Sequence, residues 1–134
     1  MTGKSAHLGK AMADATMLKA EEINKAGGIN GRLIKVTTFD DHNSPELAAK
    51  IAIEIATQSE AVLVIGHRTS GSSIAAAPIY TEHEIATISG TATADVLTIN
   101  NPWYLRATYN NRMQAEFSAI HISSDLGYRT ATLV

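Results

Sequence analysis

The stretch AVLVIGHRTSGSSIAAAP, residues 61–78, decides the fold class. Its first six residues are apolar on both faces, which is typical of a buried strand in a parallel sheet, and they end at Gly66. The alanine-rich part predicts a helix over residues 70–83, bent at Pro78 because proline removes one backbone hydrogen bond. Three serines and a threonine lie where strand passes into helix. Hydroxyls at that point are typical of a catalytic nucleophile, a phosphate-binding loop or a binding site for another anion.

The same two kinds of segment alternate along the rest of the chain. Further helices are predicted over residues 5–26, 45–58 and 111–126. Further strands are predicted over Leu33–Phe39, Ile85–Gly90, Trp103–Thr108 and from Arg129 onward. Such alternation predicts one three-layer α/β lobe spanning residues 1–134, with a mainly parallel sheet that is covered by helices on both faces.

Two of the helices carry apolar residues at helical spacing, and we expect these residues to face the core. In the helix over 45–58, which has Ser44 as its N-cap, they are Ala48, Ile51, Ala52 and Ile55. In the helix over 111–126 they are Met113, Phe117 and Ile120.

Composition excludes several classes of function. Eleven basic and 13 acidic residues give a net charge of −2, without a basic run, so neither nucleic acid nor an anionic membrane is an expected partner. The chain has no cysteine, and its five histidines lack metal-ligand spacing, so no metal or other cofactor is expected. No apolar run reaches the roughly 18 residues of a membrane span, and the first ten residues do not read as a signal peptide.

The hydroxyl cluster fits neither of the two motifs that would make it catalytic or nucleotide-binding. A nucleophile elbow is G-x-S-x-G, and here one extra residue precedes Ser70. A P-loop needs lysine after its second glycine, and Ser72 stands there. An anion seat remains, because free N–H groups and the helix dipole favour an anion at a helix start. From this motif alone, Ser70 is either a ligand donor or simply the N-cap.

A second hydroxyl cluster, ISGTATAD at residues 88–95, also follows a predicted strand. The carboxyl ends of neighbouring parallel strands lie side by side, and ligands of open α/β sheets bind at that edge. We therefore expect Ser70 to lie beside Thr91, Ala92 and Thr93, which favours a ligand site.

These stretches, in this order, resemble one protein family. EEINKAGGINGRLIKV (21–36), FDDHNSPELAAKIA (39–52), VIGHRTSGSSIAAAPIY (64–80), ISGTATADVLT (88–98) and WYLRAT (103–108) resemble the N-terminal lobe of periplasmic binding proteins of the Leu/Ile/Val-binding type. The resemblance implies a receptor of an ABC transporter that binds an amino acid or related small carboxylate, performs no chemistry, meets a membrane permease and works outside the cytoplasm.

The resemblance also implies roles for particular residues. Ser70 and Thr93 match positions that donate to the ligand carboxylate, and the main chain at Thr91 matches an acceptor for the ligand ammonium. Leu8 stands where relatives often carry an aromatic residue, and Arg68 is a candidate for selecting acidic ligands. Asp40 and Asp41 match an acidic pair that we interpret as turn and cap residues rather than catalysts.

The family pattern places a first strand before Met1 and a second lobe after Val134, so the chain reads as part of one lobe. Without that strand, we expect the isolated chain to be unstable, to self-associate or to close its sheet in a modified order, and to bind ligand poorly. Two other functions remain open: a ligand-sensing receptor or regulator of the same fold, and a small α/β hydrolase using Ser70.

Overall fold

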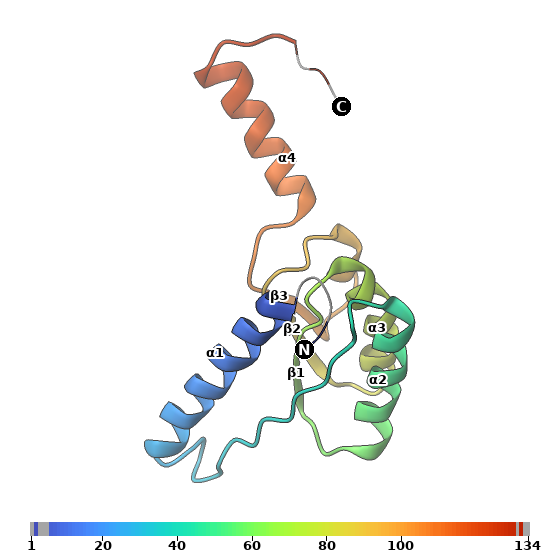
Figure 1. The fold of residues 1–134 in the computed structure, drawn as a ribbon. Coiled ribbons are helices and arrows are strands. Elements are labelled where there is room, and N and C mark those ends of the chain that lie inside the picture. Colours follow the sequence, from blue (N-terminus) through green and yellow to red (C-terminus); the bar gives the residue numbers. More distant parts are fainter. Residues whose placement is uncertain (1, 3–5, 131, 133–134) are drawn as a thin grey trace.

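The sheet at the centre of the molecule is parallel, as predicted. A computed structural model describes residues 2, 6–130 and 132, and in these residues three strands pair in the order β1-β2-β3: β1 (Leu63–Ile65), β2 (Ala86–Ser89) and β3 (Tyr104–Arg106). The register places Ile65 beside Ile88, and Ile88 beside Leu105. All three strands therefore end at one edge of the sheet, where the two hydroxyl-rich loops begin (Figure 1).

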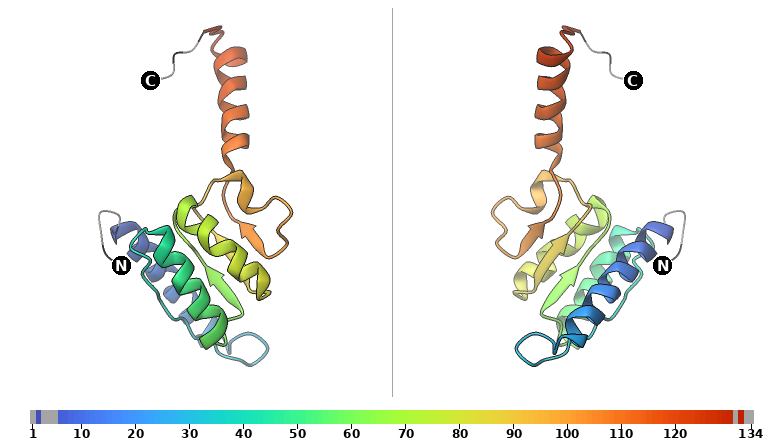
Figure 2. Two further views of the ribbon diagram at one scale, coloured as in Figure 1. Left: turned by 90° about the vertical axis from the view of Figure 1, so that its right-hand side faces the viewer. Right: turned by 90° about the vertical axis from the view of Figure 1, so that its left-hand side faces the viewer.

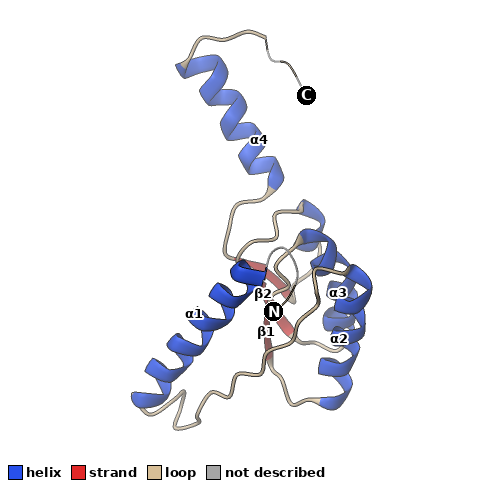
Figure 3. Ribbon diagram, in the orientation of Figure 1, coloured by secondary structure: helices blue, strands red, loops and turns tan. Residues whose placement is uncertain are grey.

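Helices lie on both sides of this sheet. α2 (Pro45–Gln58) and α3 (Ser70–Glu82) lie on one side, and α1 (Ala6–Lys25) lies on the other (Figures 1 and 2). A short 3-10 turn, η1 (Asp95–Leu97), precedes β3, and α4 (Asn111–Ile120) continues into a π-helical turn, η2 (His121–Asp125). Figure 3 shows the resulting alternation of helix and strand from α2 to α4, which confirms the predicted α/β class.

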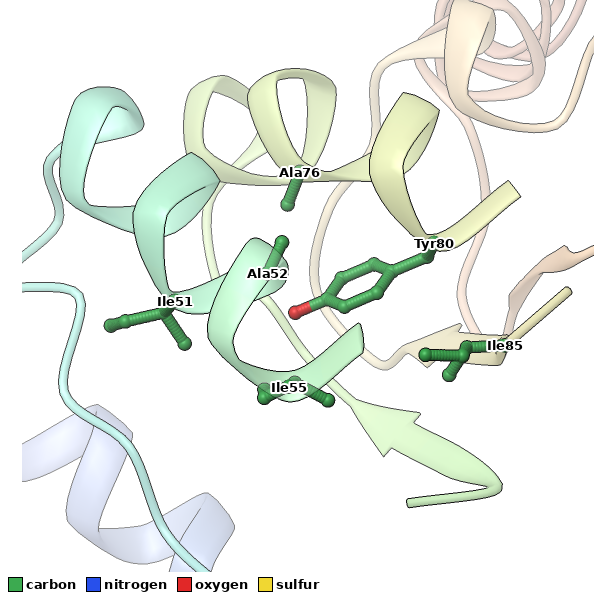
Figure 4. Close-up of a cluster of buried hydrophobic side chains, with 6 residues drawn as sticks. All are labelled: Ile51, Ala52, Ile55, Ala76, Tyr80 and Ile85. Atoms are coloured by element: carbon green, nitrogen blue, oxygen red, sulfur yellow. The ribbon is translucent and has the colours of Figure 1, made fainter. Parts of the chain in front are cut away.

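The core is built mainly between α2 and α3. Its buried residues are Ile51, Ala52, Ile55, Ala76, Tyr80 and Ile85, which Figure 4 shows interleaved between the two helices and the start of β2. Ala52 and Ala76 are both fully buried, and their small size lets the helices approach closely. The apolar face predicted for residues 45–58 is confirmed, since Ala48, Ile51, Ala52 and Ile55 are its buried residues.

The strand predicted over Leu33–Phe39 is wrong. The segment is extended but carries no sheet pairing in the described chain. Its backbone is held instead at Ile34, whose N–H and C=O bond to the side chain of Asn24 at 2.7 and 2.8 Å. Branched residues favour an extended backbone, but a strand also needs a neighbouring strand to pair with. Of the strand predicted from Arg129 to the last residue, residues 131, 133 and 134 lie outside the described residues, and residues 129, 130 and 132 carry no sheet pairing.

The inward face predicted for the last helix is also wrong. Met113, Phe117 and Ile120 are exposed, and α4 has no buried residue. The helix projects away from the body of the molecule (Figures 1 and 2). Hydrogen bonds attach it at its start, from Asn111 N to Thr93 O at 2.9 Å and from Arg112 N to Asp95 Oδ1 at 3.4 Å. Amphipathic spacing predicts a face suited to packing, but not the presence of a surface that covers it.

One face of the sheet is open, which corrects the prediction that β1 is buried on both faces. Val64 packs against the α2–α3 core, but Leu63 and Ile65 on the other face are 49% and 50% exposed. Leu105, in register with Ile65 through Ile88, is also exposed. Neither core cluster includes a residue of α1, so this helix does not seal that face.

We predict that the 134-residue chain self-associates through this face. Its sedimentation coefficient is expected to rise with concentration, because association removes the exposed apolar side chains from water. Ile65→Lys is expected to weaken the association. Ile53→Lys is a matched control, since Ile53 is 51% exposed but lies on α2. A coefficient that stays constant with concentration would contradict the prediction.

Candidate functional site

The first hydroxyl-rich loop passes from β1 into α3. Thr69 is the N-cap of α3, and its side chain accepts a hydrogen bond from Ser72 N at 3.5 Å. Ser70 is therefore the first residue of the helix and not its cap. The N-cap interpretation of Ser70 is therefore wrong, because the capping role belongs to the preceding threonine, and its role as a ligand donor stays a prediction.

The second loop contacts the first. Ala94 N donates to Ser70 Oγ at 3.3 Å, and Thr91 Oγ1 donates to the carbonyl oxygen of Arg68 at 2.6 Å. The expected proximity of Ser70 to the 91–93 segment is thus present. Ser70 Oγ accepts from Ala94, and its own proton has no acceptor among the described residues. The Thr93 side chain makes no hydrogen bond within the described part of the chain.

The electrostatic setting of Ser70 favours an anion. α3 is 13 residues long, begins at Ser70 and has no acidic residue in its first turn. The first N–H groups of a helix have no partner within it, and the helix dipole adds partial positive charge there. The side chain of Arg68, two residues earlier, is partly exposed and makes no ion pair in the described chain.

Arg106 holds the second loop in place, a role that the sequence analysis missed. From the end of β3 its guanidinium donates to the carbonyl oxygens of Ala92 at 3.4 Å and Ala94 at 2.9 Å, and to Thr98 Oγ1 at 2.7 Å. A charged residue inside the otherwise apolar stretch WYLRAT was the available signal. An arginine that is partly buried among carbonyl groups usually satisfies them, as here.

A second anchor, built on His67, holds the first loop. His67 Nδ1 lies 2.9 Å from Asp41 Oδ2, and Nε2 lies 3.1 Å from the Tyr80 hydroxyl, with the two rings stacked. Only 9% of the His67 side chain is exposed. Asp41 Oδ1 also accepts from Asn43 N at 2.9 Å, which confirms its interpretation as a turn residue. This anchor ties the loop both to the segment before α2 and to α3.

Buried hydroxyls complete the support beneath the first loop. The Tyr104 hydroxyl donates to the Gly66 carbonyl oxygen at 3.3 Å. Burial raises the pKa of Tyr104, and the hydroxyls of Ser73 and Ser89 and the charge of Arg106 offset this only in part. Tyr104 therefore stays a neutral donor throughout the physiological pH range.

The whole chain, residues 1–134, matches the family model described as periplasmic binding protein. The chain belongs to the periplasmic binding protein family. Members of this family are solute-binding proteins and perform no chemistry. The resemblance found in the sequence motifs is confirmed by this match.

Relatives of this periplasmic binding protein include proteins named for binding amino acids. It is 35% identical over 103 residues to Leu/Ile/Val-binding protein homolog 1 of Brucella abortus, a match covering 77% of this chain and 28% of that protein. The isoleucine complex of the branched-chain amino acid transporter substrate-binding protein LivJ from Streptococcus pneumoniae superposes with a TM-score of 0.84 at 32% identity, covering 94% of this chain and 36% of that one.

A third relative carries a different ligand. The solute-binding protein of an ABC transporter from Rhodopseudomonas palustris, solved with 3,4-dihydroxy benzoic acid, has a TM-score of 0.72 at 27% identity and covers 82% of this chain and 30% of that one. This periplasmic binding protein chain thus spans about a third of the length of the relatives it matches. Within its described residues, no helix is both long and apolar enough to cross a membrane.

The hydrolase alternative finds no support in the geometry of the periplasmic binding protein site. A serine nucleophile needs a base that can accept its proton. His67 is the histidine nearest to Ser70 in sequence, but its two ring nitrogens are engaged by Asp41 and Tyr80. Ser70 Oγ itself is engaged by the amide of Ala94. This arrangement suits binding rather than nucleophilic attack.

Two of the candidate residues, Ala92 and Leu8, are placed less favourably for contact with a ligand. Ala92 is buried in a core cluster, its N–H donates to Ser89 Oγ at 3.0 Å, and its carbonyl oxygen accepts from Arg106. Leu8 is 46% exposed and is the third residue of α1. The start of α1 lies at the same end of the molecule as the carboxyl edge of the sheet (Figures 1 and 2). Since no core cluster includes α1, shared packing does not bring Leu8 against Ser70.

We predict that the Asp41 anchor makes the fold sensitive to acid. Burial would raise the pKa of Asp41, but the hydrogen bonds from Asn43 and His67 hold this pKa below the ordinary 3.8. A carboxyl group whose pKa is lower in the folded state stabilises the fold above its unfolded pKa, and this contribution is lost as pH falls through the folded pKa. The free energy of unfolding should therefore drop as pH decreases below about 4.

Urea unfolding at pH 5 and pH 3 measures this drop. Asp41→Asn keeps an acceptor for His67 but cannot titrate, so it should show a smaller difference between the two pH values. Asp14→Asn, at an exposed carboxylate on α1, is the control and should keep the full difference. If Asp41→Asn retained the full difference as well, Asp41 would not be the group responsible.

Proposed function

We propose that this chain is a ligand-binding lobe of an ABC-transporter receptor, and that the receptor binds an amino acid or related small carboxylate. The observation that carries the proposal is the contact between the start of α3 and the second loop, where Ala94 N lies 3.3 Å from Ser70 Oγ. It places the Ser70 hydroxyl, the first N–H groups of α3 and the loop bearing Thr93 at one edge of the sheet.

The chemistry of these groups matches a carboxylate. Such a ligand offers two oxygen atoms with about four acceptor positions, and the Ser70 hydroxyl, the Thr93 hydroxyl and the α3 amides are donors. The helix dipole favours the negative charge. The main-chain carbonyl of Thr91 is the proposed acceptor for a ligand ammonium, and Arg68 is the proposed contact for a second acidic group.

The ligands named for the relatives support this class. Isoleucine and 3,4-dihydroxy benzoic acid differ in shape and polarity, and the carboxyl group is the ionisable feature that they share. A binding site that recognises the carboxylate group could bind either of these ligands. By the same relationship, we propose that the whole protein works outside the cytoplasm and passes its ligand to a membrane permease, as expected for a periplasmic binding protein.

The proposal predicts that Ser70→Ala and Thr93→Ala each weaken binding of L-isoleucine by the whole protein about ten- to a hundredfold. Each change removes a hydrogen bond to a charged group, which contributes about 1.5–3 kcal/mol. Isothermal calorimetry measures the change. L-Isoleucinamide, which lacks the carboxylate, should bind poorly to the unaltered protein.

Two controls keep this result specific. Thr57→Ala and Ser123→Ala remove hydroxyls that bond to carbonyl groups of their own helices at exposed positions, and both should leave the affinity unchanged. Unchanged affinity in both Ser70→Ala and Thr93→Ala would reject the assignment of the seat. If isoleucine itself does not bind, 3,4-dihydroxybenzoate is the second probe, with the same variants.

A further inference from the structure

Ser89, the last residue of β2, joins the two loops of the candidate site. It is fully buried. Its hydroxyl donates to the carbonyl oxygen of His67 at 3.2 Å and accepts from the amide of Ala92 at 3.0 Å, with the amide of Thr91 at 3.4 Å. One side chain therefore uses its proton on the first loop and its lone pairs on the second.

The group that Ser89 contacts on the first loop is itself fixed. The ring of His67 is held between Asp41 and Tyr80, and its carbonyl oxygen also accepts from Ser73 Oγ at 3.1 Å. The position of this carbonyl is thus set from two other segments of the fold. Hydrogen bonds in such a buried network are stronger than at the surface, and losing one partner leaves the others unsatisfied.

The other contacts between the loops are more accessible to solvent. Thr91, which donates to Arg68 O, is exposed, and the Ala94–Ser70 bond involves two partly exposed residues. Water competes for such groups, so these contacts alone hold the loops less firmly. Of the two bonds through Ser89, the one from the Ala92 amide is buried and the one to the His67 carbonyl is part-buried, so water competes less for them.

We propose that Ser89 is a positioning residue that fixes the spacing between Ser70 and Thr93 without touching the ligand. This inference rests on the proposed function, in which both side chains bind one carboxylate. Two donors can satisfy the same carboxylate only if their separation is set in advance, because a mobile pair must be ordered at a cost in affinity. The bridge from the His67 carbonyl to the Ala92 amide supplies that separation.

Ser89→Ala tests the bridge, and Ser73→Ala is its matched control. Both are fully buried serines whose hydroxyls donate to the same carbonyl oxygen, but only Ser89 also accepts from amides of the second loop. In the whole protein, Ser89→Ala is expected to weaken L-isoleucine binding about tenfold, while Ser73→Ala changes it less than about twofold. Circular dichroism and urea unfolding establish that both variants are folded at the temperature of the titration.

Hydrogen exchange gives a second measurement, which would not change if Ser89 stabilised only its own surroundings. The amide of Ala94 bonds to Ser70 and not to Ser89, so it reports the contact between the loops. We expect its exchange to accelerate at least about fivefold in Ser89→Ala and to stay unchanged in Ser73→Ala. The positioning role of Ser89 would be contradicted if both variants lost the same affinity. It would also be contradicted if the exchange rate of the Ala94 amide were unchanged in Ser89→Ala.

Failure of the proposed function gives a different pattern. If the unaltered protein binds neither L-isoleucine nor 3,4-dihydroxybenzoate, the carboxylate seat is rejected and with it the role of Ser89 in ligand affinity. Normal binding by Ser89→Ala, alongside weakened binding by Ser70→Ala, would keep the seat and reject Ser89 as its positioning residue.

Discussion

Replacing Ile55 with alanine is expected to destabilise the fold by about 2–5 kcal/mol, the usual cost of truncating a buried isoleucine. Ile55 is 6% exposed and lies in the core between α2 and α3, near Tyr80 and Ile85 (Figure 4). The substitution removes three carbon atoms from a site that the surrounding side chains fill only by moving. A loss of this size is a large part of the total stability of a small domain, so the urea midpoint should fall sharply or the chain should fail to fold.

Ile53→Ala is the control for this experiment. Ile53 lies on the same helix two residues earlier, is 51% exposed and undergoes the same chemical change. Its effect should stay within about 0.5 kcal/mol, as for surface substitutions in general. Equal losses for the two variants would mean that helix propensity, and not burial, determines the result, and the core described for α2 and α3 would be wrong.

Enlarging Ala52 to leucine is expected to cost about 3 kcal/mol, toward the upper end of the usual range for overpacking. Ala52 and Ala76 are both fully buried, and Figure 4 shows them where α2 and α3 face each other. Three added carbon atoms have no free volume at this contact. The helices must move apart, which also separates Ile55 from Tyr80.

The matched control is Ala115→Leu, at an exposed position of α4. Leucine and alanine are both good helix formers, so this variant should unfold at nearly the same urea concentration as the unaltered chain. If Ala52→Leu unfolded there too, the two helices would be farther apart than the structure shows. Near-ultraviolet circular dichroism of Tyr80 and the other aromatic residues would register the displacement separately from the loss of stability.

The elements that the sequence predicts correctly carry their own local signals. Ser44 and Pro45 mark the start of α2, and the Ser44 hydroxyl accepts from Leu47 N at 3.3 Å as an N-cap should. The failures arise where a segment depends on a distant partner. Among the residues that the structure describes, Leu33–Phe39 suits a strand but has no strand to pair with, and no segment covers the apolar face of α4.

The residues of the candidate site also fall into those that the sequence predicts and those that it does not. Ser70 and Thr91–Thr93 could be placed together in advance because parallel strands end at a common edge, and the structure brings their loops into contact. Their binding role stays a prediction. The supporting residues Ser89 and Tyr104 could not be recognised, because each acts through bonds to carbonyl or amide groups of another loop, and no local pattern marks such a contact. Arg106 had a signal, its charge inside the stretch WYLRAT, but not its partners.

The first turn of α3, residues 70–73, carries no charged side chain, and this bears on the medium in which such a binding site can work. Dissolved ions screen the attraction between exposed opposite charges, over a distance of about a nanometre at moderate salt. A receptor that bound its solute through a lysine would therefore lose affinity as the salt concentration rises. Hydroxyl and amide donors act at contact distance through directed bonds, which mobile ions scarcely screen. A seat made of Ser70, Thr93 and the first amides of α3 would therefore retain its solute through changes of salinity that a cell does not control outside its own membrane.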